Sequence, residues 1–351
     1  MKFSDVLDIR NGRNQRQVEN ENGKYPIYGS GGIMGRATDF ICDAGTVVIG
    51  RKGSINNPIF VDEPFWNVDT AFGLVAHRDV LLPKYLFYFC VNFDFERLNT
   101  TVTIPSLTKA NLLQIEINVP DMDEQRRVVS ILDKICQLID LQQQELHSLD
   151  QLVKSRFIEL FASVEAEDTL QNLCTFIDYR GKTPEKVESG LPFITAKNIR
   201  MHRMSFDTLE YISKETYDRV MTRGFPQIGD VVFTTEAPLG NVCRIPFIET
   251  EFYIGQRIIT MQTERLEPAY LEYALSSDEF KRKIAEKSSG STVTGIRSKL
   301  LEQLTIPVPP MALQKQFAAF VEQTDKSKLA LQKGLQELEI LKKSLMQQYF
   351  G

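Results

Sequence analysis

The chain has 351 residues, of which 42% are apolar, 10% aromatic and 25% charged. This composition is that of an ordinary globular protein of about two or three domains, and it excludes a disordered or low-complexity chain. With 41 Lys and Arg against 46 Asp and Glu, the formal net charge is −5. The chain therefore has no global positive field, which argues against a small histone-like DNA binder and leaves a local basic patch open.

The five cysteines are scattered without a CxxC pair, which argues against a metal site and against a secreted disulfide framework. The N-terminal residues MKFSDVLDIRNG are too charged for a signal peptide. The longest apolar stretch, residues 85–91, is far shorter than the ~20 residues of a membrane-spanning helix. We expect a cytoplasmic protein with reduced, buried thiols and no bound metal.

Residues 1–120 mix short strand-like runs with Gly, Pro and Asn, and predict a first globular domain. An apolar run there leads into a glycine-flanked basic loop, Arg51-Lys52-Gly53-Ser54, followed by Asn56-Asn57. Such a loop suits contacts with phosphates and base edges, and a solvated surface turn is the alternative. Residues 29–32, which precede Arg36, form a second candidate loop.

Residues 125–161 contain no Pro and no Gly and predict a helix of about 55 Å. Its apolar residues recur at alternating steps of three and four, which is the period of helix-on-helix packing. The seam residues of this helix are Leu132, Ile135, Ile139, Leu146, Leu149, Val153 and Leu160.

A second copy of this segment follows at a constant spacing, because Val119-Pro120 returns as Val308-Pro309 and Gln125 returns as Gln314. A single long helix is marginal in water, so we expect the two copies to pack against each other and to offer a face for a partner's helices. The seam residues of the second helix are Val321, Leu331, Leu335, Leu338, Leu345 and Tyr349.

Residues 166–308 predict a second globular domain that echoes the first only faintly. Thr234-Thr235 follow an apolar run and are interpreted as the equivalents of Arg51-Lys52. Residues 287–299 are either a DNA contact or a flexible loop. The candidate DNA-binding residues of this domain are Arg180, Lys182, Lys197, Asn198, Arg200, Arg203, Thr234, Thr235 and Arg297.

The expected fold is a mixed α+β class with two α/β domains in tandem, separated by two long helices. The segments are domain 1 at 1–120, helical spacer 1 at 121–165, domain 2 at 166–308 and helical spacer 2 at 309–351.

Catalytic motifs are missing from the sequence. His77, His147 and His202 have no nucleophile motif nearby, and we predict surface or packing roles for them. No Walker loop stands out, and no Asn/Asp-Pro-Pro-aromatic motif of an adenine methyltransferase does either. We interpret Trp66 as a buried anchor, with base stacking as the alternative.

Several segments taken together carry a resemblance to a known family. They are YPIYGSGGIMGRA (residues 25–37), GTVVIGRKGSINNPIFVDEPFWNVDTAFGL (45–74), VPDMDEQRR (119–127), RGKTPEK (180–186), GLPFITAKNI (190–199) and GDVVFTTEAPLGNV (229–242). In order, spacing and duplication, the chain resembles the specificity subunit of Type I restriction-modification systems. One departure is that the second helix begins VPPMALQKQF, without the Glu that precedes Gln125 in the first copy.

The resemblance implies a non-catalytic subunit of a complex that is both an adenine-specific methyltransferase and a Type I site-specific deoxyribonuclease. Each domain would contact one half of a split, asymmetric double-stranded DNA target, and the helices would pair as an antiparallel coiled coil in a pseudo-two-fold arrangement. The implied partners are two methyltransferase subunits and the restriction/translocase subunits. S-adenosylmethionine, ATP and Mg are expected on those partners, and no cofactor is expected on this chain. A coiled-coil protein-interaction scaffold without DNA specificity is the alternative.

Overall fold

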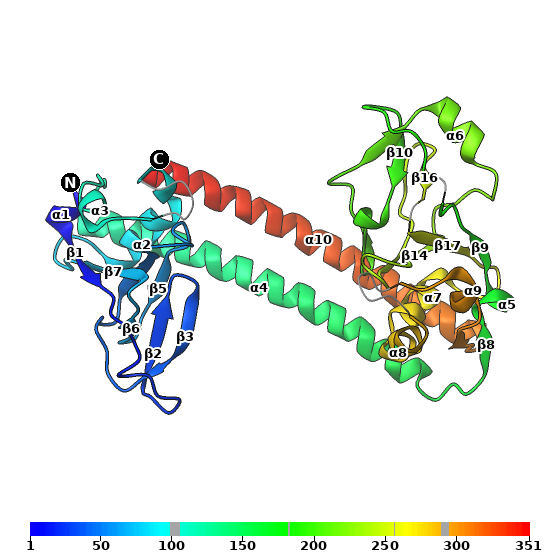
Figure 1. Cartoon of the computed structure of the whole chain (residues 1–351), viewed down its shortest axis with the longest axis horizontal. Coiled ribbons are helices and arrows are strands. Elements are labelled where there is room, and N and C mark those ends of the chain that lie inside the picture. Colours follow the sequence, from blue (N-terminus) through cyan, green and yellow to red (C-terminus); the bar gives the residue numbers. More distant parts are fainter. Residues whose placement is uncertain (99–105, 182, 256, 289–294) are drawn as a thin grey trace. The chain divides into compact units, whose positions relative to one another are not determined.

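The computed structural model describes residues 1–98, 106–181, 183–255, 257–288 and 295–351. They form two compact units (Figure 1). Unit 1 combines Met1–Gln144 with Leu331–Gly351, and unit 2 is Glu145–Ala330. The division falls inside the two long helices instead of at the domain limits expected from the sequence, because each globular domain buries apolar residues against a part of both helices.

The two helices are α4 (Met122–Phe161) and α10 (Met311–Phe350), each 40 residues long. None of the thirteen predicted seam residues is exposed, whereas apolar residues elsewhere on the helices, such as Leu329 and Ile340, are. In unit 1 the beginning of α4 shares a core with the end of α10, through Leu132 and Met346. In unit 2 the end of α4 shares a core with the beginning of α10, so within each unit the two helices run in opposite directions.

Two local contacts show how closely the helices approach. In unit 2, Lys328 of α10 forms an ion pair of 2.6 Å with Asp150 of α4. In unit 1, a Cβ atom added to Gly334 of α10 would lie 3.0 Å from the Gln142 amide nitrogen of α4. The glycine therefore leaves room for the end of the Gln142 side chain at this level.

The domain of unit 1 contains two sheets. The larger has the order β1-β7-β4-β5 and is antiparallel throughout; the smaller has the order β3-β2-β6, with β6 parallel to β2. The elements are α1 (Phe3–Val6), β1 (Leu7–Asn11), β2 (Tyr25–Gly29), β3 (Gly32–Ala37), β4 (Thr46–Gly50), β5 (Ile59–Val61), β6 (Trp66–Asn67), β7 (Ala71–Ala76), α2 (Pro83–Asn92), the short η1 (Phe95–Leu98) and α3 (Lys109–Leu112).

The domain of unit 2 repeats this topology and adds to it. Its larger sheet has the order β9-β17-β14-β15 and is antiparallel, and its second sheet has the order β13-β10-β16, again with one parallel pair. The elements are β8 (Glu167–Thr169), α5 (Leu170–Leu173), β9 (Thr175–Ile177), β10 (Leu191–Ile194), the short η2 (Ala196–Asn198), β11 (Ile199–Arg200), β12 (Arg203–Met204), β13 (Glu210–Ile212), α6 (Lys214–Val220), β14 (Val231–Thr234), β15 (Val242–Arg244), β16 (Tyr253–Ile254), β17 (Ile258–Gln262), α7 (Pro268–Ser276), α8 (Asp278–Lys287), α9 (Ser298–Glu302) and β18 (Thr305–Pro307).

A buried glutamine joins each domain to the beginning of a long helix. The Gln125 side-chain oxygen accepts a hydrogen bond from the Leu82 N–H (2.8 Å), just before α2, and its amide donates to the Pro120 carbonyl (2.9 Å). Gln314 does the same with the Glu267 N–H (2.9 Å), just before α7, and the Pro309 carbonyl (2.8 Å). The repeat seen in the sequence is therefore also a repeat of contacts.

One tyrosine completes each joint. Tyr85 donates its O–H to the Asn118 carbonyl (3.2 Å), and Tyr270 donates to the Pro307 carbonyl (2.6 Å). Burial raises the pKa of both phenols, which keeps them protonated as donors at neutral pH.

The remaining expectations on burial concern single residues. Trp66 is buried and donates its indole N–H to the Arg13 carbonyl (3.0 Å), which confirms the anchor role. Cys42, Cys90, Cys174 and Cys243 are buried and Cys136 is half-buried, all as free thiols. Over the described parts of the chain, no helix has the length and apolar character needed to cross a membrane.

Candidate nucleic-acid interface

The loops at the end of β4 in unit 1 and of β14 in unit 2 are built on the same backbone contacts. In unit 1 the Arg51 N–H donates to the Thr70 carbonyl (2.8 Å), and the Arg51 carbonyl accepts from the Leu107 N–H (2.9 Å). In unit 2 the Thr235 N–H donates to the Arg257 carbonyl (2.8 Å), and the Thr235 carbonyl accepts from the Ile296 N–H (3.0 Å). We call these two loop clusters the strand-end rims, residues 51–57 with Thr70 and Ser106 in unit 1, and residues 235–240 with Arg257 and residues 295–297 in unit 2.

The rim of unit 1 presents polar side chains to solvent. Arg51, Lys52, Ser54 and Asn57 are exposed, and the Arg51 guanidinium lies 5.7 Å from the centroid of the Phe72 ring. Gly53 has a φ of 81°, a left-handed conformation that favours glycine and turns the loop. The rim therefore holds two cations on a short, defined loop, which suits phosphate contacts.

The side chains of two other predicted residues of unit 1 already make hydrogen bonds within the protein. The Asn56 side chain donates to Asp94 (2.9 Å) and accepts from the Phe95 N–H (2.7 Å), so it fastens the rim to η1. Arg36, on β3, donates to the carbonyls of Gly23 (2.7 Å) and Lys24 (2.9 Å).

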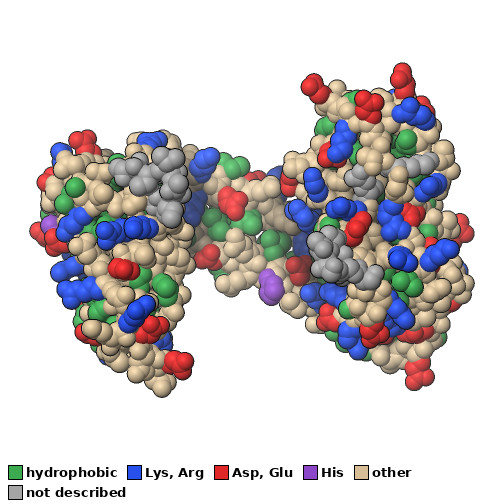
Figure 2. All heavy atoms as spheres, in the orientation of Figure 1, with side chains coloured by type: hydrophobic (Ala, Val, Ile, Leu, Met, Phe, Trp, Pro, Cys, Tyr) green, Lys and Arg blue, Asp and Glu red, His purple; other side chains and the backbone are tan. Residues whose placement is uncertain are grey.

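In unit 2 the exposed cations among the predicted residues lie on two neighbouring segments. Lys197 and Arg200 are exposed around η2 and β11, and Arg203 pairs with Arg200 across the β11–β12 hairpin. The Asn241 side chain, just before β15, donates to the Ile199 carbonyl (2.8 Å) and holds this hairpin next to the rim. Arg297 is exposed on the rim itself. Figure 2 shows Lys and Arg side chains interleaved with Asp and Glu over each unit.

Three predictions of DNA-binding residues in this unit are wrong. Thr234 and Thr235 are buried, and the Thr234 hydroxyl accepts from the Asn241 N–H (2.9 Å). Asn198 is also buried, because its side chain bonds to the Thr195 N–H (2.9 Å) and to the Ser205 carbonyl (3.1 Å). It serves as the end of a capping box and is not free to read a base.

Arg180 braces the rim from inside. Its guanidinium is bidentate to Asp178 (2.9 and 2.7 Å) and also contacts the hydroxyls of Thr235 and Ser298. Burial raises the pKa of Asp178, but the hydrogen bonds from Ser298 and Arg180 outweigh it and lower the pKa overall. Arg180 therefore supports the rim, and because its side chain is 25% exposed its contact with DNA stays a prediction. Lys182 lies outside the described residues.

Two residues that the sequence reasoning missed occupy the centre of the second rim. Lys52 pairs with Ser106 in unit 1, and Glu236 pairs with Gly295 in unit 2, so Glu236 is the equivalent of Lys52. Thr235 thus corresponds to Arg51 and Glu236 to Lys52, so the predicted match of Thr234-Thr235 with Arg51-Lys52 is one residue out of register. Glu236 is 3.5 Å from Arg257, and both side chains are about half exposed. Aligning the end of β4 with the end of β14 and counting two residues further along each chain segment identifies Glu236 as the equivalent of Lys52.

His202 has a packing role, as predicted. Its ring stacks on Tyr273 at a centroid distance of 4.2 Å, and Nδ1 lies 2.8 Å from the buried Glu272 carboxylate. Arg244 bridges that carboxylate (2.6 Å) to Asp325 of α10 (2.9 Å). This network ties the β11–β12 hairpin and β15 to the long helix.

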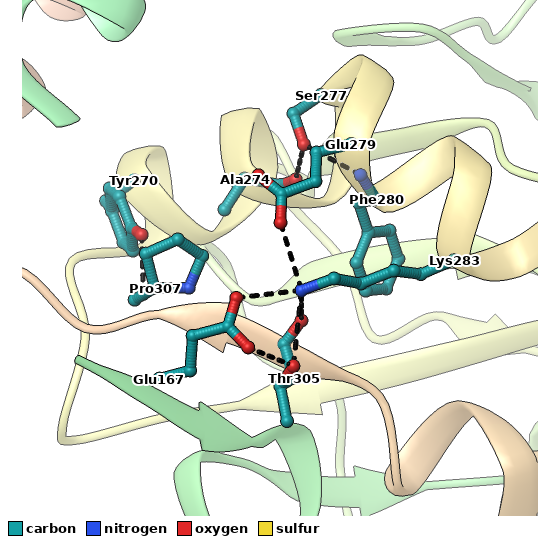
Figure 3. Close-up of polar contacts among 9 residues, drawn as sticks. All are labelled: Glu167, Tyr270, Ala274, Ser277, Glu279, Phe280, Lys283, Thr305 and Pro307. Carbon is teal, nitrogen blue, oxygen red and sulfur yellow. Dashed lines mark hydrogen bonds and ion pairs between the residues drawn. The ribbon is translucent and has the colours of Figure 1, made fainter. Parts of the chain in front are cut away.

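A cluster of polar contacts surrounds Lys283 in unit 2 (Figure 3). Lys283 of α8 is held by the carboxylates of Glu167 (2.8 Å) and Glu279 (3.2 Å) and by the Thr305 carbonyl (3.1 Å). Beside it is a cavity of about 610 Å³, lined by the end of α4, the α7–α8 junction and β18. In the part of the chain that the structure describes, no group of three or more His, Cys, Asp or Glu side chains is arranged to hold a metal ion.

The fold and the two rims define a class: a duplicated protein in which two domains of like topology present different polar loops and share two long helices. The chain belongs to the family described as the Type I restriction modification DNA specificity domain, whose model matches residues 1–151 and again residues 168–340, as a specificity subunit with two such domains. This family assignment favours DNA recognition over a scaffold without DNA specificity.

Individual relatives agree with the family. The Type I restriction enzyme MjaVIII specificity subunit of Methanocaldococcus jannaschii is 22% identical over 335 residues, covering 87% of this chain and 75% of the relative. A Type I restriction-modification S subunit from M. genitalium has the same fold, with a TM-score of 0.67, 17% identity and coverage of 100% and 95% of the two chains. A chain from a type I R-M system studied for complex assembly and conformational transition has a TM-score of 0.58 at 18% identity, covering 100% and 96%.

Proposed function

We propose that each domain binds one half of a split DNA target and that the two halves differ in sequence. The observation that carries this is the pair of strand-end rims, which share their backbone hydrogen bonds but present Arg51 and Lys52 in one domain and Glu236 and Arg257 in the other. Scaffolds of like topology with unlike side chains would position two readers in the same way and give them different preferences. The full target is then asymmetric.

The helices would serve both as spacer and as partner surface. We propose that α4 and α10 pair as an antiparallel coiled coil along their whole length, which would relate the two domains by a pseudo-two-fold axis and fix the distance between the half-sites. Support comes from the unexposed seam residues and from the opposite helix directions within each unit.

Apolar side chains outside the seam supply the docking surface. Leu138 and Ile340 are exposed in unit 1, and Leu152 and Leu329 are exposed in unit 2. Exposed apolar side chains on a helix that already has an apolar seam point to a further helical partner. We assign this surface to two methyltransferase subunits, joined by restriction subunits, with S-adenosylmethionine, ATP and Mg bound by those partners.

Methylome sequencing tests the proposal. The chain is expressed with its cognate methyltransferase in a host that lacks other adenine methylation, and methylated adenines are mapped. A split, asymmetric motif with adenine methylation in both halves is the expected result. A verified complex that adds no new methylation would contradict DNA recognition and would restore the scaffold alternative.

A further inference from the structure

The apolar part of the cavity lining in unit 2 is aromatic and aliphatic. Phe157 and Phe161 of α4, Phe280 of α8 and Ile306 of β18 line it, and Ala274 of α7 offers only a methyl group. Its volume of about 610 Å³ falls within the ~300–1,000 Å³ of ligand pockets in proteins. A cavity of about 150 Å³ already accepts benzene, so this one has room for an aromatic side chain and its backbone.

The charges around the cavity do not select an anion. Lys283 has its ammonium group surrounded by the oxygens of Glu167, Glu279 and Thr305, so it is committed to the protein itself (Figure 3). The remaining charged side chains are of both signs, and the acidic ones disfavour a DNA phosphate. The charged residues of the lining are Lys154, Glu165, Glu167, Asp278, Glu279, Lys281 and Lys283.

The region of unit 1 that corresponds to this cavity can be located from the joint between each domain and its long helices. The joint places Tyr85 against Phe350 (centroids 5.0 Å apart) in unit 1 and Tyr270 against Phe161 (4.8 Å) in unit 2, both edge to face. Counting along α2 and α7 from these tyrosines, Phe89 of unit 1 corresponds to Ala274 of unit 2.

Phenyl rings occupy the region in unit 1. Phe89 packs on Phe350 (6.3 Å), on Phe3 (5.6 Å) and in a stack on Phe93 (5.5 Å). In unit 2, Ala274 lines the cavity at the position of Phe89 and supplies no ring. The cavity therefore lies where the other copy of the scaffold carries a phenyl ring.

We propose that this cavity binds an aromatic side chain of the methyltransferase subunit, which replaces the ring that Ala274 does not supply in unit 2. The proposal rests on the function proposed above, which supplies that partner. Ile158, 62% exposed on α4, forms one wall of the cavity, so the long helix that we assign to partner docking leads directly to it. An aromatic anchor buried here would fix the partner at one end of the helix.

The test is Ala274→Phe in the full chain, because it gives unit 2 the residue that unit 1 already has. We expect the variant to fold with an unchanged or raised Tm and to bind the purified methyltransferase at least tenfold more weakly in a titration. Ala285→Phe is the matched control, since Ala285 is exposed on α8 outside the cavity, and it should bind as the wild type does. Wild-type affinity in Ala274→Phe would overturn the proposal.

A second variant guards against misfolding. Ile158→Lys changes an exposed residue in the cavity wall. It should also weaken the binding of the methyltransferase, again without a drop in Tm. If both variants fold and neither weakens assembly, the cavity does not hold the partner.

A titration without the partner separates this proposal from the proposed function. N-acetyl-L-phenylalaninamide should shift the Ile306 methyl NMR signal of the wild type and leave that of Ala274→Phe unchanged, and N-acetyl-L-alaninamide should shift neither. If the wild type does not assemble with the methyltransferase at all, the proposed function fails. The fragment result then decides on its own: no shift with the aromatic amide overturns the aromatic site, whereas a shift supports it.

Discussion

The two domains place opposite charges at one and the same backbone position. Lys52 in unit 1 and Glu236 in unit 2 follow equivalent strands and pair with equivalent residues, Ser106 and Gly295. A lysine there can neutralise a phosphate, whereas a carboxylate is repelled by phosphates and accepts hydrogen bonds from base amino groups, cytosine N4 among them. The duplicated scaffold thus fixes where a side chain is offered, and the residue type decides what it can contact.

The largest effect is expected from removing both cations of the first rim. Arg51→Ala with Lys52→Ala should reduce methylation of one half-site at least tenfold. It should also reduce the slope of log K against log[salt] for DNA binding by the equivalent of up to about two phosphate contacts. Assembly with the methyltransferase should be unchanged. Binding at several salt concentrations measures this, with Arg16→Ala, an exposed arginine elsewhere in unit 1, as control. A loss of assembly in a folded variant would show that the rim is a protein interface.

Changing the carboxylate of the second rim should alter preference more than affinity. Glu236→Ala should relax discrimination by about 1–3 kcal/mol at a single base pair of the other half-site, because one base contact is lost. Glu236→Lys, which installs the residue of unit 1, should steepen the salt dependence instead. Methylome sequencing of both variants checks this, with Glu249→Ala as an exposed control. An unchanged motif in both would exclude Glu236 from base contact.

The glutamine joints should behave alike in the two units. Gln125→Ala leaves the Leu82 N–H and the carbonyls of Val80 and Pro120 without their side-chain partner, and Gln314→Ala leaves the Glu267 N–H and the Pro309 carbonyl without theirs. We expect each change to cost roughly 1–3 kcal/mol. Urea unfolding of the full chain measures the loss, and Gln137→Ala and Gln316→Ala, both exposed on the same helices, should cost little. Clearly unequal losses would mean that the two joints are not equivalent supports.

The smallest effect concerns acid stability, in which the units should differ. Asp178 follows β9, and the sheet register places Asn11 of β1 at the equivalent position of unit 1. Because the pKa of Asp178 in the folded chain is lowered below 3.8, its contribution is complete above that value and is lost as pH falls through the folded pKa. Asp178→Asn should therefore reduce the loss of unit 2 stability as the pH falls below about 4. Thermal unfolding at a series of pH values measures this. A fall as steep as in the wild type would assign the acid sensitivity to other carboxylates.

The long-range layout could be predicted from the sequence because it depends on periodicity. A seam of period 3.5 and a repeat with constant spacing identify two helices, and the predicted seam residues are indeed unexposed. The solvent-facing residues of the rims were harder to predict from the sequence. In a strand, a shift of one residue exchanges the inner and outer faces, so Thr235 was assigned to solvent when its neighbour Glu236 has that position. Asn198 was misjudged because its partners, the Ser205 carbonyl among them, come together only in the folded domain.

The division of the helices between the units also sets an order of events during synthesis. The last residues of the chain, from Leu331 onward, belong to unit 1, and Met346 and Phe350 pack into its core. The ribosome must therefore make all of residues 145–330 before unit 1 can be completed, a delay of roughly 10–40 s at about 5–20 residues per second. During this interval Val128 and Leu132 of α4 lack their α10 neighbours, whereas unit 2 is made as one continuous stretch. The domain that is translated first is thus the one that finishes folding last.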